Sequence, residues 1–303
     1  MSITLMDGGM GREIARRLDG AGHGLWSAKA LVEAPQIVLD IHQEYIAAGA
    51  AMILTNTYAT VPHYLAKEGL ADEYLSYTRL AGELARQAVQ ESTGVPDNVQ
   101  VAGALPPLNE SYRADLVPPA AEAEPVYRAM VETLLPYVDL YICETMSSAE
   151  EAFVAAQQAV LSGEGKPVFV AWTLNEQPGA GLRSGESLTE AFERVAALDL
   201  SGFMLNCTSP EAIEAGLPEL LALTDKPIGC YANRLDKVPQ GWTLDNTLSA
   251  GQRTDLTTDY FVAMSQRFVA AGGSMVGGCC GIGPDDIAAL KHALDARPAP
   301  QNP

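Results

Sequence analysis

Positively charged side chains are scarce in this chain. Its 303 residues include 19 Lys and Arg against 38 Asp and Glu, which gives a formal net charge of −19 at pH 7. Proteins that bind nucleic acid rely on Lys and Arg to neutralise backbone phosphates. The charge balance therefore argues against a nucleic-acid partner. The acidity otherwise favours solubility and indicates no particular fold.

Long apolar runs and a disulfide pattern are also missing. No run reaches the roughly 18 apolar residues that a membrane-spanning helix needs, and residues 1–7 lack the basic and apolar regions of a signal peptide. The five cysteines are an odd number without the spacing of a secreted disulfide framework. We therefore expect no membrane partner and a reducing compartment, the cytoplasm. Nothing in the sequence indicates an oligomeric state.

Short β-type runs alternate with helical patterns along the whole sequence. Eight strand–helix units are present, and their strands are almost continuously apolar, as is typical of a parallel sheet covered by helices. The expected strands are 3–6, 52–57, 99–104, 139–144, 167–173, 202–207, 227–232 and 274–278. This pattern predicts a single-domain (β/α)8 TIM barrel over residues 1–297, followed by a disordered tail at 298–303. The alternative is an open doubly wound sheet, which would place polar groups on fewer strands.

Two adjacent cysteines, Cys279 and Cys280, follow the last expected strand in a glycine-rich turn. Vicinal cysteines do not easily form a disulfide with each other, but both can face one metal ion. A catalytic zinc takes three protein ligands and keeps a fourth position open, and Cys207 follows another apolar strand in a similar setting. We therefore predict a zinc site of Cys207, Cys279 and Cys280, with the fourth position left for a substrate sulfur. The competing interpretation is that the vicinal cysteines are small packing residues.

Two carboxylates also stand at expected strand ends, where TIM barrels carry their chemistry. Asp7 follows the first strand and Glu144 the fourth, and each could receive an ammonium group through a charge-assisted hydrogen bond. The alternatives are a turn carboxylate for Asp7 and a helix-capping carboxylate for Glu144. Cys143 and Cys230 lie inside strands and are expected to be core residues.

Five short motifs, in order along nearly the full chain, together resemble the zinc-dependent homocysteine S-methyltransferase family, in its cobalamin-independent, single-barrel members. The motifs are Asp7-Gly8-Gly9-Met10-Gly11, Thr55-Asn56-Thr57-Tyr58, Glu144-Thr145, Asn206-Cys207 and Gly277-Gly278-Cys279-Cys280-Gly281. The resemblance implies that the three cysteines hold zinc, that zinc binds the homocysteine thiolate, and that Asp7, Thr55 and Glu144 lie near the bound amino acid. Asn206 is expected to orient the site through a hydrogen bond to a metal ligand or to the substrate.

Every donor that this resemblance implies is an onium compound: S-methylmethionine, dimethylsulfoniopropionate or betaine. Such cations favour aromatic faces. The aromatic residues near expected strand ends are Trp26, Tyr58, Tyr112 and Trp172, and each can also be an ordinary packing residue. Loop 105–113 departs from the Gly-Pro-Tyr-Gly-type turn of family members that use S-methylmethionine. We expect this loop and loop 233–256 to select the donor.

The sequence therefore predicts a zinc enzyme that moves a methyl group from a small onium donor to the homocysteine thiolate and forms methionine without cobalamin. Two alternatives stand beside it. One is a catalytically silent barrel that binds zinc and thiols. The other is a metal-free barrel enzyme in which Asp7 and Glu144 act as acid and base.

Overall fold

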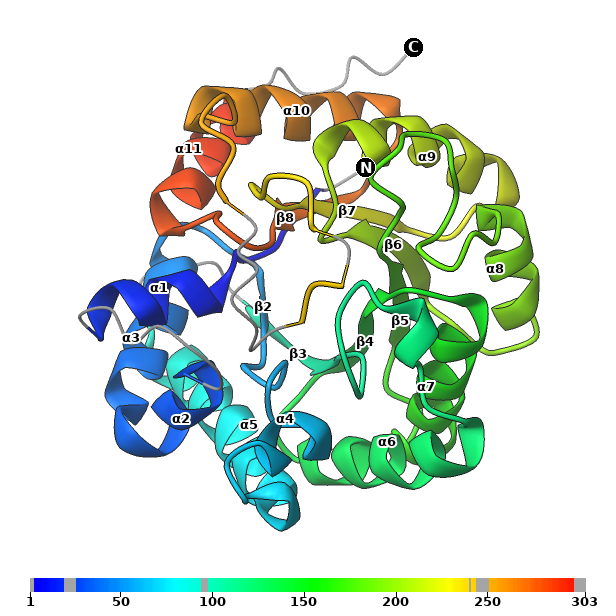
Figure 1. The fold of residues 1–303 in the computed structure, drawn as a ribbon. Helices are drawn as coiled ribbons and strands as arrows, with labels where there is room; N and C mark the ends of the chain where they lie inside the picture. The colour runs from blue at the N-terminus through cyan, green and yellow to red at the C-terminus, as the bar shows by residue number, and fades with distance from the viewer. Residues whose placement is uncertain (1–2, 19–25, 94–97, 240, 244–250, 297–303) are drawn as a thin grey trace.

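Eight parallel strands form the centre of this computed structural model, which describes residues 3–18, 26–93, 98–239, 241–243 and 251–296. The strands make one sheet in the order β1-β8-β7-β6-β5-β4-β3-β2. Figure 1 shows this sheet inside a ring of helices. The predicted single-domain (β/α)8 barrel is confirmed. The tail predicted at 298–303 lies outside the described residues.

The elements of the described chain alternate as a barrel requires. The strands are β1 (Thr4–Leu5), β2 (Met52–Leu54), β3 (Gln100–Leu105), β4 (Leu140–Met146), β5 (Val168–Trp172), β6 (Gly202–Asn206), β7 (Ile228–Ala232) and β8 (Met275–Gly278). The α-helices are α1 (Met10–Arg17), α2 (Trp26–Glu33), α3 (Pro35–Ala47), α4 (Pro62–Ala66), α5 (Tyr74–Glu91), α6 (Ala120–Leu134), α7 (Ala149–Ser162), α8 (Leu188–Val195), α9 (Pro210–Leu223), α10 (Thr258–Ala271) and α11 (Pro284–Asp295).

The sheet closes on itself between β1 and β2. Met6 and Met52 form a parallel bridge there. On either side of it, Ala51 N–H donates to Leu5 O at 2.8 Å and Asp7 N–H donates to Met52 O at 3.0 Å. Closure excludes the open doubly wound alternative. It also brings the C-terminal ends of all eight strands to one rim.

Strand side chains alternate between the barrel interior and the layer of helices. In β4, Leu140 and Ile142 belong to the cluster inside the barrel, whereas Tyr141 and Cys143 pack toward the helices. The same alternation continues to Glu144, which therefore points inward near the rim. Cys230, in β7, also lies in the outer layer. Cys143 and Cys230 are both free and fully buried, as predicted for core cysteines.

The structure differs from the sequence expectation at several element boundaries. The helices α2 and α4 were not predicted from the sequence. β2 ends at Leu54, three residues before the expected end, because side-chain hydrogen bonds replace the backbone ladder beyond it. Thr57 Oγ1 donates to Ala104 O at 2.6 Å, and Thr55 Oγ1 accepts from Ala104 N–H at 3.0 Å. In the described residues, no helix has both the length and the apolar character needed to cross a bilayer.

Tyr45 on α3 offers a test of how the first and last loops are held together. Its hydroxyl, on a fully buried side chain, lies 3.1 Å from Gly9 O and 3.0 Å from Ile282 O. Tyr45→Phe should lower the free energy of unfolding by about 1 kcal/mol, the usual net value of one hydrogen bond. Urea denaturation followed by circular dichroism measures the change. Tyr74→Phe is the control, since the Tyr74 hydroxyl has no hydrogen bond to the described residues, and equal stability of Tyr45→Phe and wild type would contradict the expectation.

Candidate active site

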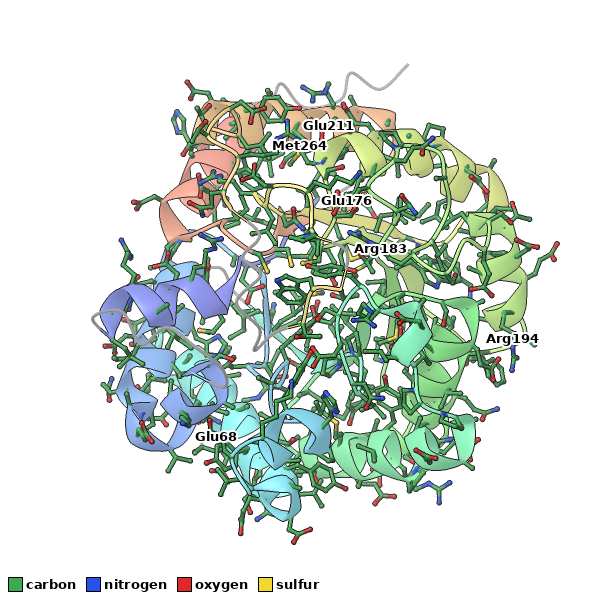
Figure 2. All side chains as sticks on the ribbon, in the orientation of Figure 1. Glu68, Glu176, Arg183, Arg194, Glu211 and Met264 are labelled. Carbon is green, nitrogen blue, oxygen red and sulfur yellow. The ribbon has the colours of Figure 1, made fainter. Side chains whose placement is uncertain are left out.

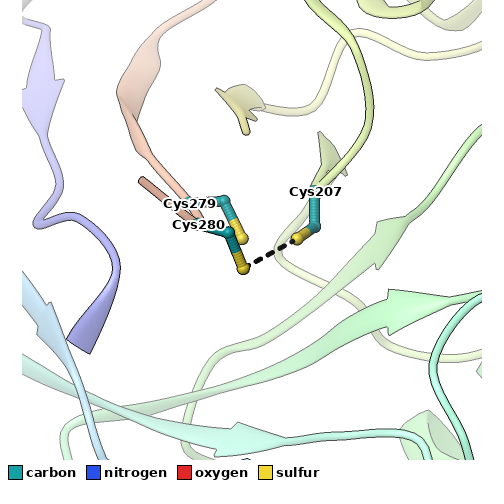
Figure 3. Close-up of side chains that lie close together, drawn as sticks. All are labelled: Cys207, Cys279 and Cys280. Carbon is teal, nitrogen blue, oxygen red and sulfur yellow. Dashed lines mark hydrogen bonds between the residues drawn. The ribbon is translucent and has the colours of Figure 1, made fainter. Parts of the chain in front are cut away.

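Three cysteine sulfurs meet at the C-terminal rim of the barrel. Cys207 follows β6, whereas Cys279 and Cys280 follow β8, and Figure 3 shows the three side chains turned toward one another. The Sγ atoms of Cys207 and Cys280 are 3.8 Å apart, and all three lie within 4.8 Å of one another. Two sulfurs on one tetrahedral zinc at about 2.3 Å would be about 3.8 Å apart. The spacing and the thiolate chemistry of these residues therefore fit a zinc ion.

Glycines allow the loop after β1 to pack directly on the cysteine loop. A Cβ at Gly9 would lie 2.7 Å from Cys279 O, and one at Gly8 would lie 2.5 Å from Ile282 O. Both contacts are too short for any larger residue unless the backbone moves. Cys279 is further tied to the barrel by its N–H, which donates to Ala232 O at 2.9 Å. The glycines after Asp7 thus position the cysteines as well as Asp7.

The three thiols differ in acidity because they hydrogen-bond to one another. Bonds from the thiols of Cys207 and Cys279 hold the pKa of Cys280 well below its usual value. The pKa of Cys279 is raised because its protonated thiol forms hydrogen bonds with Cys207 and Cys280, and these bonds stabilise the protonated form. Cys280 is therefore the first of the three to become a thiolate, the form that binds metals.

Asp7 and Glu144 are buried carboxylates on the same rim, 5% and 7% exposed. Loss of hydration on burial raises the pKa of each to about 8, and nearby negative charge at Cys207 and Asp7 raises that of Glu144 further. Asp7 Oδ2 accepts from Leu54 N–H at 2.8 Å, whereas the Glu144 carboxylate has no hydrogen bond or ion pair to the described residues. A buried carboxylate without a partner favours binding of a cation.

The capping role weighed for Glu144 does not match its contacts, whereas Asp7 does bond to its own backbone as a turn carboxylate would. The helix after Glu144 is capped by Ser148, whose Oγ accepts from Glu151 N–H at 3.2 Å. Glu144 itself lies within β4, two residues before the strand ends. Asp7 bonds to the neighbouring strand β2, with Leu54 as its partner. The side chains of Asp7 and Glu144 therefore belong to the rim of the barrel.

Asn206 holds the residue after Glu144 in place. Its Oδ1 accepts from Thr145 N–H at 3.0 Å, and its Nδ2 donates to Thr145 Oγ1 at 2.8 Å. Thr145 has a φ of +60°, in the left-handed region that a β-branched residue rarely adopts. Asn206 thus stabilises a strained turn between Glu144 and α7. Its contacts are those of a residue that positions Glu144.

The residues expected from β2 are only partly available to a ligand. The Thr55 hydroxyl already bonds to Thr57 Oγ1 at 3.0 Å and to Ala104 N–H, within the barrel wall. Tyr58 OH lies 2.6 Å from Ser111 Oγ. Burial is the main cause of the raised pKa of Tyr58, and the negative charge at Cys207 contributes to it. The side chain of Trp26 lies outside the described part of the chain.

Tyr112, one of the aromatic candidates, reaches the cysteines, and Trp172 does not. Tyr112 OH is 3.0 Å from Cys207 Sγ, and its ring lies 5.5 Å from the Trp242 ring. The two loops expected to select a donor therefore meet above the sulfurs. Trp172 is fully buried in the layer between sheet and helices, stacked at 5.7 Å on Phe203. Trp172 is a packing residue, because it faces away from the barrel interior.

Three residues near the site were not singled out by the sequence. Tyr231 is buried inside the barrel, and its hydroxyl has no hydrogen-bond partner in the part of the chain that the structure describes. Burial raises the pKa of Tyr231, and the charges of Glu144, Cys279 and Cys207 raise it further. Alternation along β7, with Cys230 outward, could have identified it. Arg183 and Trp242 reach the site from long loops, and no periodic pattern marks such residues.

Comparison with known proteins agrees with the geometry. The family model for homocysteine S-methyltransferase matches residues 4–294. A homocysteine S-methyltransferase of Escherichia coli (strain K12) is 31% identical, over 95% of this chain and 94% of that protein. A selenocysteine Se-methyltransferase of Brassica oleracea var. italica is 28% identical, over 97% of this chain and 89% of that protein.

The solved structure of a metal-loaded relative shares the fold. The metallated form of the Escherichia coli homocysteine methyltransferase MmuM aligns with a TM-score of 0.78 and 27% identity, and the alignment covers 96% of each chain. The family match extends over almost the whole barrel, including all three cysteines. The chain therefore belongs to the homocysteine S-methyltransferase family.

Proposed function

We propose that this protein is a zinc-dependent methyltransferase that moves a methyl group from a small onium donor to the thiolate of homocysteine, giving methionine. The observation that carries the proposal is the placement of three sulfurs, at the spacing of zinc ligands, on the same rim as Glu144, a buried carboxylate without a partner among the described residues. The names of the relatives support homocysteine as the acceptor. Both substrates are small molecules.

The carboxylates would bind the amino-acid end of homocysteine. Glu144 has an unfilled capacity for hydrogen bonds, and an α-ammonium group supplies both the charge and the donors that it lacks. Asp7 supplies a second carboxyl group from the loop after β1, and a bound ammonium group would stabilise its ionised form. Asn206 maintains the position of Glu144 through Thr145, and Thr55 supports the adjacent wall. Tyr231 adds a hydroxyl inside the barrel that a bound amino acid can approach.

The cysteines would hold the metal that activates the acceptor sulfur. A free thiol is mostly protonated near neutral pH and is then a weak nucleophile. Zinc bound by Cys207, Cys279 and Cys280 supplies the positive charge that favours the thiolate form of homocysteine. Tyr112 OH lies 3.0 Å from Cys207 Sγ and can hydrogen-bond to that sulfur. Cys207 is buried and Cys279 and Cys280 are half-buried, which limits the contact of the sulfurs with water.

The donor would bind above the sulfurs, between the loops after β3 and β7. Tyr112 and Trp242 place two rings there, 5.5 Å apart, and aromatic faces attract onium cations. Tyr58, hydrogen-bonded to Ser111 beside Tyr112, and Trp26 are further proposed contributors. The thiols require a reducing compartment to stay free of disulfides, so we place the reaction in the cytoplasm.

A direct assay tests the proposed function. Zinc-loaded protein is incubated with homocysteine and each of S-methylmethionine, dimethylsulfoniopropionate and betaine, and methionine is measured by mass spectrometry. We expect methionine to form with at least one donor, and a chelator to abolish its formation. Homocysteine binding without turnover of any donor would instead identify a catalytically silent thiol-binding protein. Full activity after complete removal of zinc would contradict the role of the metal.

Substitution of single cysteines separates ligands from packing residues. Cys207→Ser, Cys279→Ser and Cys280→Ser should each lose bound zinc, about one ion per chain in the wild type. Methyl transfer should fall at least about 100-fold, because the thiolate is no longer stabilised. Cys230→Ala is the control, since Cys230 is buried outside the barrel interior. Zinc content is read by mass spectrometry, and a ligand variant that keeps both zinc and activity would refute the assignment.

Glu144→Gln tests the buried carboxylate through the pH dependence of stability. In the folded protein its pKa rises from 4.5 to about 8, so the folded chain keeps a proton that the unfolded chain releases. Wild-type stability therefore loses a contribution as pH rises through that interval. The stability of Glu144→Gln relative to wild type should grow between about pH 4.5 and pH 8 and stay constant above it. Urea denaturation across this range measures the difference.

The same variant should bind homocysteine at least about tenfold more weakly, since a charge-assisted hydrogen bond is lost. Titration calorimetry measures the affinity. Glu122→Gln, at the exposed start of α6, is the control for loss of a surface carboxylate. A stability difference that does not vary with pH, or an unchanged homocysteine affinity, would show that Glu144 does not have the role described.

A further inference from the structure

We propose that Arg183 binds the carboxylate of the methyl donor, and that this protein therefore uses zwitterionic donors with a carboxylate beside the onium centre. The inference rests on the proposed transfer from an onium donor to homocysteine. It adds the group that selects the donor, which the family resemblance leaves open.

Arg183 comes from the loop after β5 and lies over the barrel. The loop turns back on itself through an antiparallel bridge between Leu174 and Leu182, directly before Arg183. Figure 2 shows Arg183 and Glu176 inside the ring of helices, whereas Arg194 lies at its outer edge. The Arg183 side chain is only 9% exposed. Burial of a loop arginine in so acidic a chain calls for a reason beyond solubility.

One tyrosine side chain separates the Arg183 guanidinium from the sulfur cluster. The guanidinium carbon lies 4.7 Å from the centre of the Tyr112 ring. At the other end of the same side chain, the hydroxyl lies 3.0 Å from Cys207 Sγ. A molecule the size of a short amino acid can therefore extend along Tyr112, with one end at the sulfurs and the other at Arg183.

The hydrogen-bonding capacity of Arg183 is not filled. One terminal nitrogen donates to Glu176 Oε1 at 2.9 Å, but Nε is buried and has no hydrogen-bond partner among the described residues. A buried charged donor without an acceptor is costly, and a guanidinium binds carboxylates through two adjacent nitrogens. An incoming carboxylate would supply the missing acceptor while the ion pair with Glu176 holds the side chain in place.

The charges of the site match the two ends of such a donor. Thiolates at Cys207, Cys279 and Cys280 attract an onium centre, and Arg183 attracts a carboxylate. Asp7 and Glu144 are buried carboxyl groups whose ionised form a bound ammonium group would stabilise, so they favour the ammonium group of the acceptor. The zwitterion would thus lie with its methyl groups toward the sulfurs, as transfer requires.

The competing explanation is that Arg183 only anchors its loop through Glu176 and Tyr112. The experiment compares each acid donor (S-methylmethionine, dimethylsulfoniopropionate and betaine) with its methyl ester, which keeps the onium centre and loses the carboxylate charge. The variants are Arg183→Met and Arg194→Met. Arg194 is a matched control, because it also pairs with a carboxylate, Glu150 at 2.8 Å, and also stacks on an aromatic ring, Phe153 at 3.3 Å.

Two readouts are taken on the zinc-loaded protein in the presence of homocysteine. Calorimetry measures donor binding, and methionine formation gives KM and kcat for each donor. We expect Arg183→Met to weaken binding and raise KM for the acid donor about 10- to 100-fold, the effect of losing a charge-assisted pair. The ester should be nearly unaffected, so that the wild-type preference for the acid disappears. Arg194→Met should behave as wild type, and homocysteine affinity should not change.

Each other outcome has a definite meaning. Equal losses for acid and ester, or a wild type without preference for the acid, overturn the inference and leave a structural role for Arg183. A fall in homocysteine affinity in Arg183→Met overturns it by assigning the residue to the acceptor. Preferential binding of the acids that depends on Arg183, without any methionine formed, supports the inference and contradicts the proposed function. Absence of donor binding overturns the inference.

Discussion

The contact between the loops after β1 and β8 is the constraint on which the site depends. Gly8 and Gly9 let these loops approach so closely that a Cβ at either position would collide with a backbone oxygen. That contact fixes Cys279 and Cys280 at the place where Cys207 arrives from β6, with all three sulfurs within 4.8 Å. Thiolates this close repel one another unless they share a cation. The arrangement is therefore best understood as a ligand set built by closure of the barrel.

The acidic groups and the cationic Arg183 lie on different sides of the sulfurs. The interior of the barrel contributes carboxylates and a tyrosine hydroxyl, held by strands and by the bonds from Asn206 to Thr145. The long loops contribute Tyr112, Trp242 and Arg183, which contact one another above the cluster. Strand-borne groups suit the proposed amino-acid acceptor, whereas loop-borne groups can vary with the donor. This division explains how one barrel can keep its acceptor while its donor changes.

The sequence predicted the parts of the site that follow from strand order. Cys207, Cys279, Asp7 and Glu144 stand at or near the carboxyl ends of strands, and closure of eight parallel strands brings such residues to one rim. Side-chain direction was harder to predict. Trp172 points into the helical layer, and the Thr55 hydroxyl is used by the barrel wall. Both outcomes depend on where β5 and β2 end, and side-chain hydrogen bonds shifted the end of β2 by three residues.

Tyr112 was a candidate from the sequence, but its contact with Cys207 and the approach of Arg183 could not be predicted, because both depend on tertiary contacts. Tyr112 adopts a φ of +64° and reaches Cys207 from the loop after β3, while Arg183 reaches the same ring from the loop after β5. The central claim of the account is that the homocysteine sulfur joins the three cysteine sulfurs on one zinc ion. X-ray absorption at the zinc edge, with and without homocysteine, tests it most directly. The account predicts that the zinc gains one sulfur neighbour at about 2.3 Å on addition of homocysteine, from three to four. An unchanged number of sulfur neighbours would contradict it.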